Sequence, residues 1–245
     1  MRGLVSVIAL AGCATPQQTV TVLAASSLQR AYTELERRFE HDNPGVDVRL
    51  SFAGSQTLAT QIRHGIAADV YTSADVQHIR TLQSAGLIDD ATKVTCNALV
   101  LATSSPPAVE LSALDRVHSL IIGTAQVPIG RYTDQLLDAA EVEYGAAWRR
   151  GVRSHIVSRE HNASLVANKI AMGEAHTAIV YATDAKALRL TSTELPPTLA
   201  PQPCYHQAPI HRAPSSELGA RWMTLVTSPV GAEIMARYGF DAALP

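Results

Sequence analysis

The sequence contains little that would indicate nucleic-acid binding or a membrane span. Of its 245 residues only 5% are aromatic, and 20 Lys plus Arg are balanced by 22 Asp plus Glu, for a net charge of −2. Such a chain has no basic surface for nucleic acid and none of the interleaved aromatics typical of single-strand binders. No apolar run reaches the roughly 18 residues that a membrane span requires. The 47% hydrophobic content indicates a globular chain with one large core or two smaller ones.

Enzyme motifs are also missing. There is no Gly-x-Ser-x-Gly nucleophile elbow, no His-Glu-x-x-His and no Cys/His spacing of a metal site. The nine histidines are scattered, and His161, beside a helix-capping asparagine, is interpreted as solvated surface. We therefore expect a protein that is not an enzyme, has no cofactor and coordinates no metal directly. A serine hydrolase is the alternative enzyme class.

Only three cysteines occur, and the first belongs to an N-terminal targeting signal. Arg2 precedes the apolar run Gly3–Ala11, and Leu-Ala-Gly precedes Cys13. This pattern is similar to a bacterial lipobox and predicts cleavage before Cys13, lipid attachment to its sulfur and an extracytoplasmic, lipid-anchored protein. Residues 1–18 would then be signal peptide and tether. A chance apolar leader, or a wrongly placed start, is the alternative.

What is present is a repeated junction of strand, small polar residues and helix. Val20–Ala25 is apolar and stops at Ser26 and Ser27, after which apolar residues recur at helical spacing from Leu28. Val46–Phe52 ends similarly before Ser55. Unpaired N–H groups and hydroxyls at the start of a helix form an anion-binding site. The simpler interpretation is that these serines only cap their helices.

Further strands and helices alternate along the whole chain and predict an α/β fold of parallel, doubly wound sheets. Asp75 and Asn162 are expected helix N-caps, and Pro128 suits a helix start. The later expected elements include the strands 97–102, 119–123, 154–158, 177–180 and 205–211, and the helices 132–140, 216–227 and 230–238.

Five segments in this order resemble the molybdate-binding proteins of bacterial ABC importers: VTVLAASSLQRAY, FAGSQTLATQIRHGIAADVYTSAD, VPIGRY, GEAHTAIVYATDA and the closing RYGF. The resemblance covers nearly the whole chain after the leader. It implies a two-lobed periplasmic-binding-protein fold of type II, with doubly wound sheets and the oxyanion in a cleft between lobes. It implies no covalent chemistry, a membrane permease as partner and a monomeric protein.

The resemblance also implies a division into lobes. Residues 19–95 with 204–245 would form lobe 1, and residues 96–203 would form lobe 2. The two points where the chain passes from one lobe to the other then lie beside the remaining cysteines. We therefore expect a Cys96–Cys204 disulfide, which an oxidising compartment would preserve. Two buried, reduced thiols are the alternative.

Matching the family's ligand positions to this chain implicates five residues in oxyanion binding: Ser27, Ser55, Ile129, Ala163 and Tyr181. The serines would donate hydroxyl and backbone N–H groups, Tyr181 its hydroxyl, and the other two their backbone N–H. Ile129 stands where the family usually has Ala or Ser, and Ala163 where Val is common. Backbone donors tolerate both changes.

The chemistry of these five positions agrees with an unprotonated tetrahedral dianion. Such an anion offers only acceptors, and the five positions supply only donors without any charged side chain. Phosphate carries a proton near neutral pH and requires an acceptor, so it is disfavoured. The predicted ligand is molybdate, with tungstate as a second ligand; another oxyanion such as sulfate is the alternative, since donor chemistry alone does not separate them.

Overall fold

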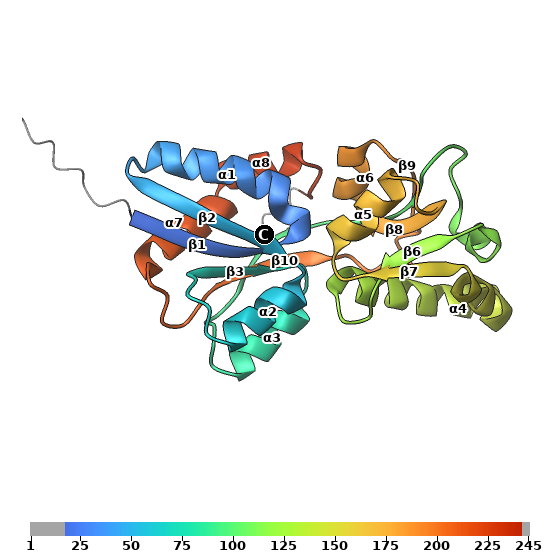
Figure 1. The fold of residues 1–245 in the computed structure, drawn as a ribbon, viewed down its shortest axis with the longest axis horizontal. Coiled ribbons are helices and arrows are strands. Elements are labelled where there is room, and N and C mark those ends of the chain that lie inside the picture. The colour runs from blue at the N-terminus through green and yellow to red at the C-terminus, as the bar shows by residue number, and fades with distance from the viewer. Residues whose placement is uncertain (1–17, 242–245) are drawn as a thin grey trace, which may run out of the picture.

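The computed structural model describes residues 18–241, so the predicted signal peptide, tether and Cys13 lie outside the described residues. Two sheets with flanking helices lie side by side along the long axis of the molecule (Figure 1). No helix within the described part of the chain has both the length and the apolar composition needed to cross a membrane.

The first sheet has the strand order β2-β1-β3-β10-β4. Strands β1, β2 and β3 are parallel, whereas β10 is antiparallel to both of its neighbours. Its strands are β1 (Gln18–Ala25), β2 (Val46–Ala53), β3 (Val70–Ser73), β4 (Thr92–Cys96) and β10 (Cys204–Pro209).

Helices cover both faces of this sheet, and alternate residues of β1 face the two layers. Val20 and Val22 pack with helices α1, α7 and α8, while Leu23 packs with α2 and α3. The bounds are η1 (Ser26–Leu28), α1 (Gln29–Asp42), α2 (Ser55–Arg63), α3 (Val76–Ser84), α7 (Ser216–Thr227) and α8 (Pro229–Arg237).

The second sheet repeats this plan with the order β7-β6-β8-β5-β9. Strands β6, β7 and β8 are parallel, and β5 is antiparallel to β8 and β9. The elements are β5 (Leu99–Thr103), η2 (Leu111–Arg116), β6 (Leu120–Gly123), α4 (Pro128–Ser154), β7 (Ile156–Glu160), α5 (Ala163–Ala171), β8 (Thr177–Tyr181), α6 (Ala182–Leu188) and β9 (Thr191–Glu194).

The predicted parallel, doubly wound arrangement holds for four strands of each sheet, and one strand in each, β10 or β5, runs the opposite way, so both sheets are mixed. The reason lies in the path of the chain. In each sheet the carboxyl ends of the parallel strands face the other sheet. When the chain passes from one sheet to the other, its next strand, β5 or β10, starts at this facing edge. That strand therefore runs antiparallel to the neighbours already there. An apolar run does not reveal this direction, because a buried strand has the same composition in either orientation.

Other expectations agree with the structure to within a few residues. Asp75 and Asn162 cap α3 and α5 through their side chains. Helix α4 is longer than expected, because a second helical segment continues beyond Gly145, whose φ of 88° kinks the helix. Neither β4, β9 nor α6 was expected.

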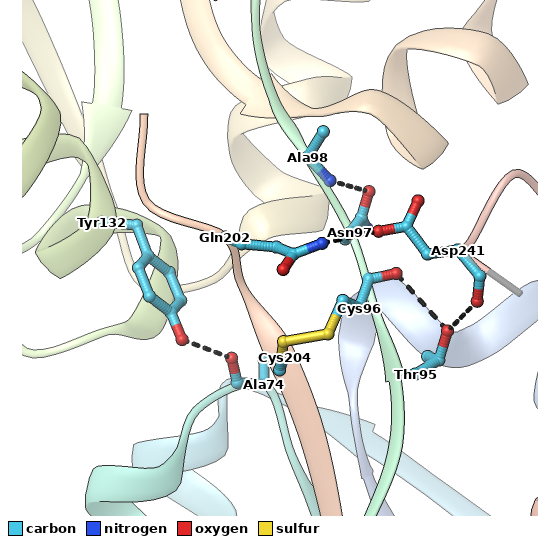
Figure 2. Close-up of a disulfide and its surroundings, with 9 residues drawn as sticks. All are labelled: Ala74, Thr95, Cys96, Asn97, Ala98, Tyr132, Gln202, Cys204 and Asp241. Atoms are coloured by element: carbon cyan, nitrogen blue, oxygen red, sulfur yellow. Dashed lines mark hydrogen bonds between the residues drawn. A yellow bond between two sulfur atoms is a disulfide. The ribbon is translucent and has the colours of Figure 1, made fainter. Parts of the chain in front are cut away.

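The two crossing segments lie next to each other. Cys96 and Cys204 are paired in register at the ends of β4 and β10 and form a disulfide (Figure 2). Asp241, near the C-terminal end of the described chain, accepts a hydrogen bond from the Thr95 hydroxyl through its backbone carbonyl, at 2.8 Å. We propose the division into lobe 1 (19–95 and 204–245) and lobe 2 (96–203), in keeping with one sheet on either side of these crossings.

Candidate functional site

The five candidate residues occupy equivalent places, where a parallel strand gives way to a helix. Ser27 lies in η1 after β1, and Ser55 begins α2 after β2. Ile129 is the second residue of α4, Ala163 the first of α5, and Tyr181 the last of β8. The carboxyl edges of the two sheets therefore present them toward each other, as expected for ligand sites of open α/β sheets.

All five line one cavity between the sheets. The remaining lining residues are Ala25, Ser26, Ala53, Gly54, Ala74, Val127, Pro128 and Asn162. The space open to the centre of a water molecule is about 10 Å³. Adding the water radius gives a hollow roughly 2.7 Å in radius if it is spherical. A cavity of this size suits one small ion.

The lining carries no charged side chain. Its polarity comes from hydroxyls and from the N–H groups of the first turns of α4 and α5. Within residues 18–241, the N–H groups of Ile129 and Ala163 have no hydrogen-bond acceptor, as is usual at a helix start. Each helix start also contributes partial positive charge. The side-chain oxygen of Asn162, the polar lining atom best suited to accept, is occupied by the N–H of Leu165 at 2.9 Å.

Tyr181 brings a buried hydroxyl without a partner. The residue is 1% exposed, and its Oη has no hydrogen-bond partner among the described residues. Burial raises the pKa of Tyr181 well above its usual value, so the hydroxyl keeps its proton. An unsatisfied buried hydroxyl destabilises the protein unless something occupies the cavity and accepts its hydrogen bond.

The Ser55 hydroxyl is oriented by the backbone beside it. The N–H of Ala74 donates to Ser55 Oγ at 3.1 Å, and the Tyr71 hydroxyl donates to the Ser55 carbonyl at 2.8 Å. Ser55 Oγ thus accepts one hydrogen bond from the backbone, and its own O–H remains available as a donor. Ser27 is half-buried and its Oγ lies 2.8 Å from the Tyr205 hydroxyl.

Contacts across the cavity hold the two sides together. Gln56 Nε2 donates to the carbonyl of His161 at 2.9 Å, and the Tyr132 hydroxyl donates to the Ala74 carbonyl at 3.3 Å (Figure 2). Arg131 forms an ion pair with Asp75, and both side chains are mostly buried. The structure is thus a closed form. The His161 side chain is exposed, as expected, and only its backbone takes part.

A larger cavity of about 540 Å³ adjoins the site through Ser26 and Ser27. Arg30 from α1 and Asp184 from α6 line it on opposite sides. Asp184 Oδ2 is buried without a hydrogen-bond partner in the described chain, and burial raises the pKa of this carboxyl to about 7.

Sequence reasoning missed Tyr205, Gly54 and the Asp75–Arg131 pair. Asp75 was expected only as a helix cap, although its second oxygen meets Arg131. No periodicity or motif links residues that stand 56 positions apart, so only the tertiary structure reveals this pair. No group of three His, Cys, Asp or Glu suited to hold a metal ion occurs within residues 18–241.

Comparison with known proteins agrees with this geometry. Residues 20–241 match the family described as bacterial extracellular solute-binding protein. The molybdate-binding protein ModA of Mycobacterium tuberculosis is 31% identical over 237 residues, which covers 94% of this chain and 87% of that protein. A putative ABC transporter substrate-binding lipoprotein of Bacillus subtilis is 27% identical over 199 residues, covering 76% and 74%.

The fold agrees as well. The periplasmic molybdate-binding protein of Azotobacter vinelandii superposes with a TM-score of 0.80 at 18% identity, covering 92% of this chain and 99% of that one. The two-lobed periplasmic-binding-protein fold expected from the sequence is therefore confirmed. The chain belongs to the bacterial extracellular solute-binding proteins, and it is similar over nearly its whole length to members that are named as molybdate-binding.

Proposed function

We propose that the protein captures molybdate between its two lobes and delivers it to the permease of an ABC importer. The observation that carries the proposal is the small, uncharged cavity lined by all five candidate donors. A dianion without a proton can accept from Ser27, Ser55 and Tyr181 and from two helix starts. Hydrogen bonds to a charged group contribute about 1.5–3 kcal/mol each.

The donor set also supports tungstate, which has the same charge and shape. Hydrogen phosphate would bring its own O–H, which would meet another donor and leave a buried polar group unpaired. Sulfate satisfies the same chemistry, and only its smaller size separates it. The family is one of solute-binding proteins, and a hydrolytic activity has no support in the lining of the cavity.

The deciding experiment is isothermal titration of the fragment from Ala14 onward with molybdate, tungstate, sulfate and phosphate. We expect micromolar or tighter Kd values for molybdate and tungstate and negligible heat with phosphate. Sulfate binding stronger than molybdate binding would keep the mechanism and change the substrate. Absence of heat with all four anions would overturn the proposal.

Two variants test the assignment of the site. Ser27→Ala and Ser55→Ala each remove one hydroxyl donor and should weaken molybdate binding more than tenfold, since a lost hydrogen bond to a charged ligand costs about 1.5–3 kcal/mol. Ser154→Ala, whose exposed hydroxyl donates to Gly151 far from the cavity, is the matched control. Unchanged affinity in both site variants would contradict the assignment.

We further propose that the protein is a lipid-anchored monomer outside the cytoplasm, in line with the lipobox pattern ending at Cys13 and the lipoprotein among its relatives. Full-length protein should fractionate with membranes and incorporate a radiolabelled fatty acid. Cys13→Ser should abolish the label and release the protein. A label that persists in the variant would contradict the anchor.

A further inference from the structure

The hydroxyl of Ser27 stands at the end of a chain of hydrogen bonds that begins at the crossing between the lobes. We propose that Asn97 and Tyr205 are positioning residues that force Ser27 to act as a donor toward the oxyanion. This inference rests on the proposed function of the same cavity. It assigns a role to two side chains that are absent from the cavity lining.

The chain begins with the amide of Asn97, whose orientation is determined by its surroundings. Asn97 Oδ1 accepts the N–H of Ala98 at 2.9 Å (Figure 2). The amide nitrogen therefore faces the other way, toward Thr183 Oγ1 at 2.9 Å and Tyr205 Oη at 3.4 Å. An amide nitrogen only donates, so the Tyr205 oxygen receives a hydrogen from Asn97.

The Tyr205 hydroxyl then has a single place for its own hydrogen. The residue is fully buried, and within residues 18–241 its Oη contacts only Asn97 Nδ2 and Ser27 Oγ. Because Nδ2 does not accept, the hydrogen lies on the 2.8 Å line to Ser27 Oγ. Burial raises the pKa of Tyr205, so this proton is retained at any physiological pH.

Ser27 Oγ consequently accepts from Tyr205 and turns its own hydrogen away from it, into the cavity. A free serine hydroxyl rotates and can accept or donate, so it would tolerate an anion that carries a proton. A serine held as donor favours an anion that offers acceptors alone. The hydrogen-bond chain thus contributes to the rejection of protonated anions as well as to affinity.

A double-mutant cycle with Tyr205→Phe and Ser27→Ala tests the inference, with affinity measured by titration with molybdate. Phenylalanine keeps the ring that packs against Phe240 at 5.5 Å between ring centres and removes only the hydroxyl. We expect Tyr205→Phe to weaken binding about tenfold in the wild-type background and by less than about twofold when Ser27 is already Ala. Additive losses would overturn the positioning role.

The selectivity between phosphate and molybdate is a second measurement, and it would not change if Tyr205 only supported the packing of the protein. Tyr205→Phe frees Ser27 to accept, so the ratio of phosphate Kd to molybdate Kd, with the phosphate Kd taken from competition against molybdate, should fall about fivefold or more. A general loss of packing would weaken both anions equally and leave this ratio unchanged, which would also overturn the inference. Tyr32→Phe removes a buried hydroxyl that donates to Thr72 Oγ1 at 3.1 Å, and it is the matched control.

The two proposals fail in different ways. A wild-type protein that binds none of the four oxyanions removes the proposed function and this inference together. A wild-type protein that binds molybdate, with an additive cycle, removes the positioning role alone.

Discussion

At the scale of single residues, the buried hydroxyl of Tyr181 separates binding from stability. This hydroxyl has no partner in the described protein, so Tyr181→Phe removes an unsatisfied polar group. We expect the stability of the free protein, in which the open cavity admits water to this hydroxyl, to change by less than about 1 kcal/mol, while molybdate affinity falls about tenfold or more. Thermal unfolding with and without molybdate measures both effects.

A comparison of two buried tyrosines sharpens this test. Tyr32→Phe breaks an existing hydrogen bond to Thr72 and should destabilise the protein by about 1 kcal/mol without weakening binding. If Tyr181→Phe behaved like Tyr32→Phe, its hydroxyl would have no role in the cavity.

The carboxyl of Asp184 makes stability depend on pH. Its pKa is raised from 3.8 to about 7 by burial, so the folded protein holds this proton over a pH range in which the unfolded chain has lost it. Stability therefore falls as pH rises from about 4 to 7 and stays lower above that range. Asp184→Asn should raise Tm more at pH 8 than at pH 4, and a gain of about 1 kcal/mol corresponds to roughly 2–4 °C.

The control for this prediction is Asp90→Asn, at an exposed position distant from the site. It should change Tm little at either pH. An equal effect of Asp184→Asn at both pH values would contradict the burial of an unpaired carboxylate.

At the scale of elements, the start of α2 lies close to the start of α5. A Cβ on Gly54 would lie 2.6 Å from the backbone oxygen of His161 across the cavity. Gly54 has φ −63° and ψ 139°, which alanine adopts readily, so Gly54→Ala should fold normally and close incompletely. We expect a molybdate affinity at least about tenfold weaker, because incomplete closure leaves donors out of reach.

Small-angle scattering measures the closure itself. Molybdate should reduce the radius of gyration of the wild type more than that of Gly54→Ala. Gly219→Ala, where the added Cβ meets only lobe 1 atoms, the nearest at 3.3 Å, is the control and should close normally. Full closure of Gly54→Ala would contradict the prediction, because it would show that the His161 backbone moves to make room for the added Cβ.

The first turns of α3 and α4 are joined by the Asp75–Arg131 ion pair, with His78 Nε2 3.1 Å from the guanidinium. Asp75→Asn keeps the helix cap, because asparagine caps equally well, and removes the charge. Arg131 then lacks its carboxylate in the closed form only. We expect molybdate to dissociate about three- to tenfold faster with little change in association rate, measured by stopped flow.

Arg49→Gln provides a control for that experiment, since it breaks an exposed ion pair with Asp47 on the far part of the first sheet. Its kinetics should match the wild type. A slower association in Asp75→Asn, at unchanged dissociation, would indicate steering of the anion instead of a closed-state contact.

At the scale of the whole molecule, the disulfide closes a loop that contains the entire second sheet. Cys96 and Cys204 are 108 residues apart, and cross-linking so long a loop restricts the unfolded chain strongly. Replacing both by alanine should lower the free energy of unfolding by about 2–4 kcal/mol. Neither cysteine lines the cavity, so the affinity of the folded variant should stay within about twofold.

Denaturant unfolding of the wild type with and without a reductant gives a second measurement. Reduction should reproduce the loss seen in the double variant and should leave the variant itself unaffected. A wild type that is indifferent to reduction would show that the cross-link adds nothing to stability.

Much of this molecule follows from local sequence. Strands such as 20–25 and helices such as 216–227 are specified by hydrophobic period, and Asp75 and Asn162 by capping chemistry, because these signals act over a few residues. The five cavity positions were predicted from the family resemblance, and at Ser27 and Ser55 the junction of a strand with a helix already indicates an anion-binding site.

Other features depend on residues that are distant along the chain. The antiparallel course of β10, the Asp75–Arg131 pair and the chain from Asn97 through Tyr205 to Ser27 have no local signal. Each arises only when two sheets are brought edge to edge, because hydrogen-bond direction and close approach depend on positions in space. The sequence alone determined most of the helices and strands and the kind of anion that their junctions suit, and the tertiary structure decided how the donors converge and which way their hydrogens point.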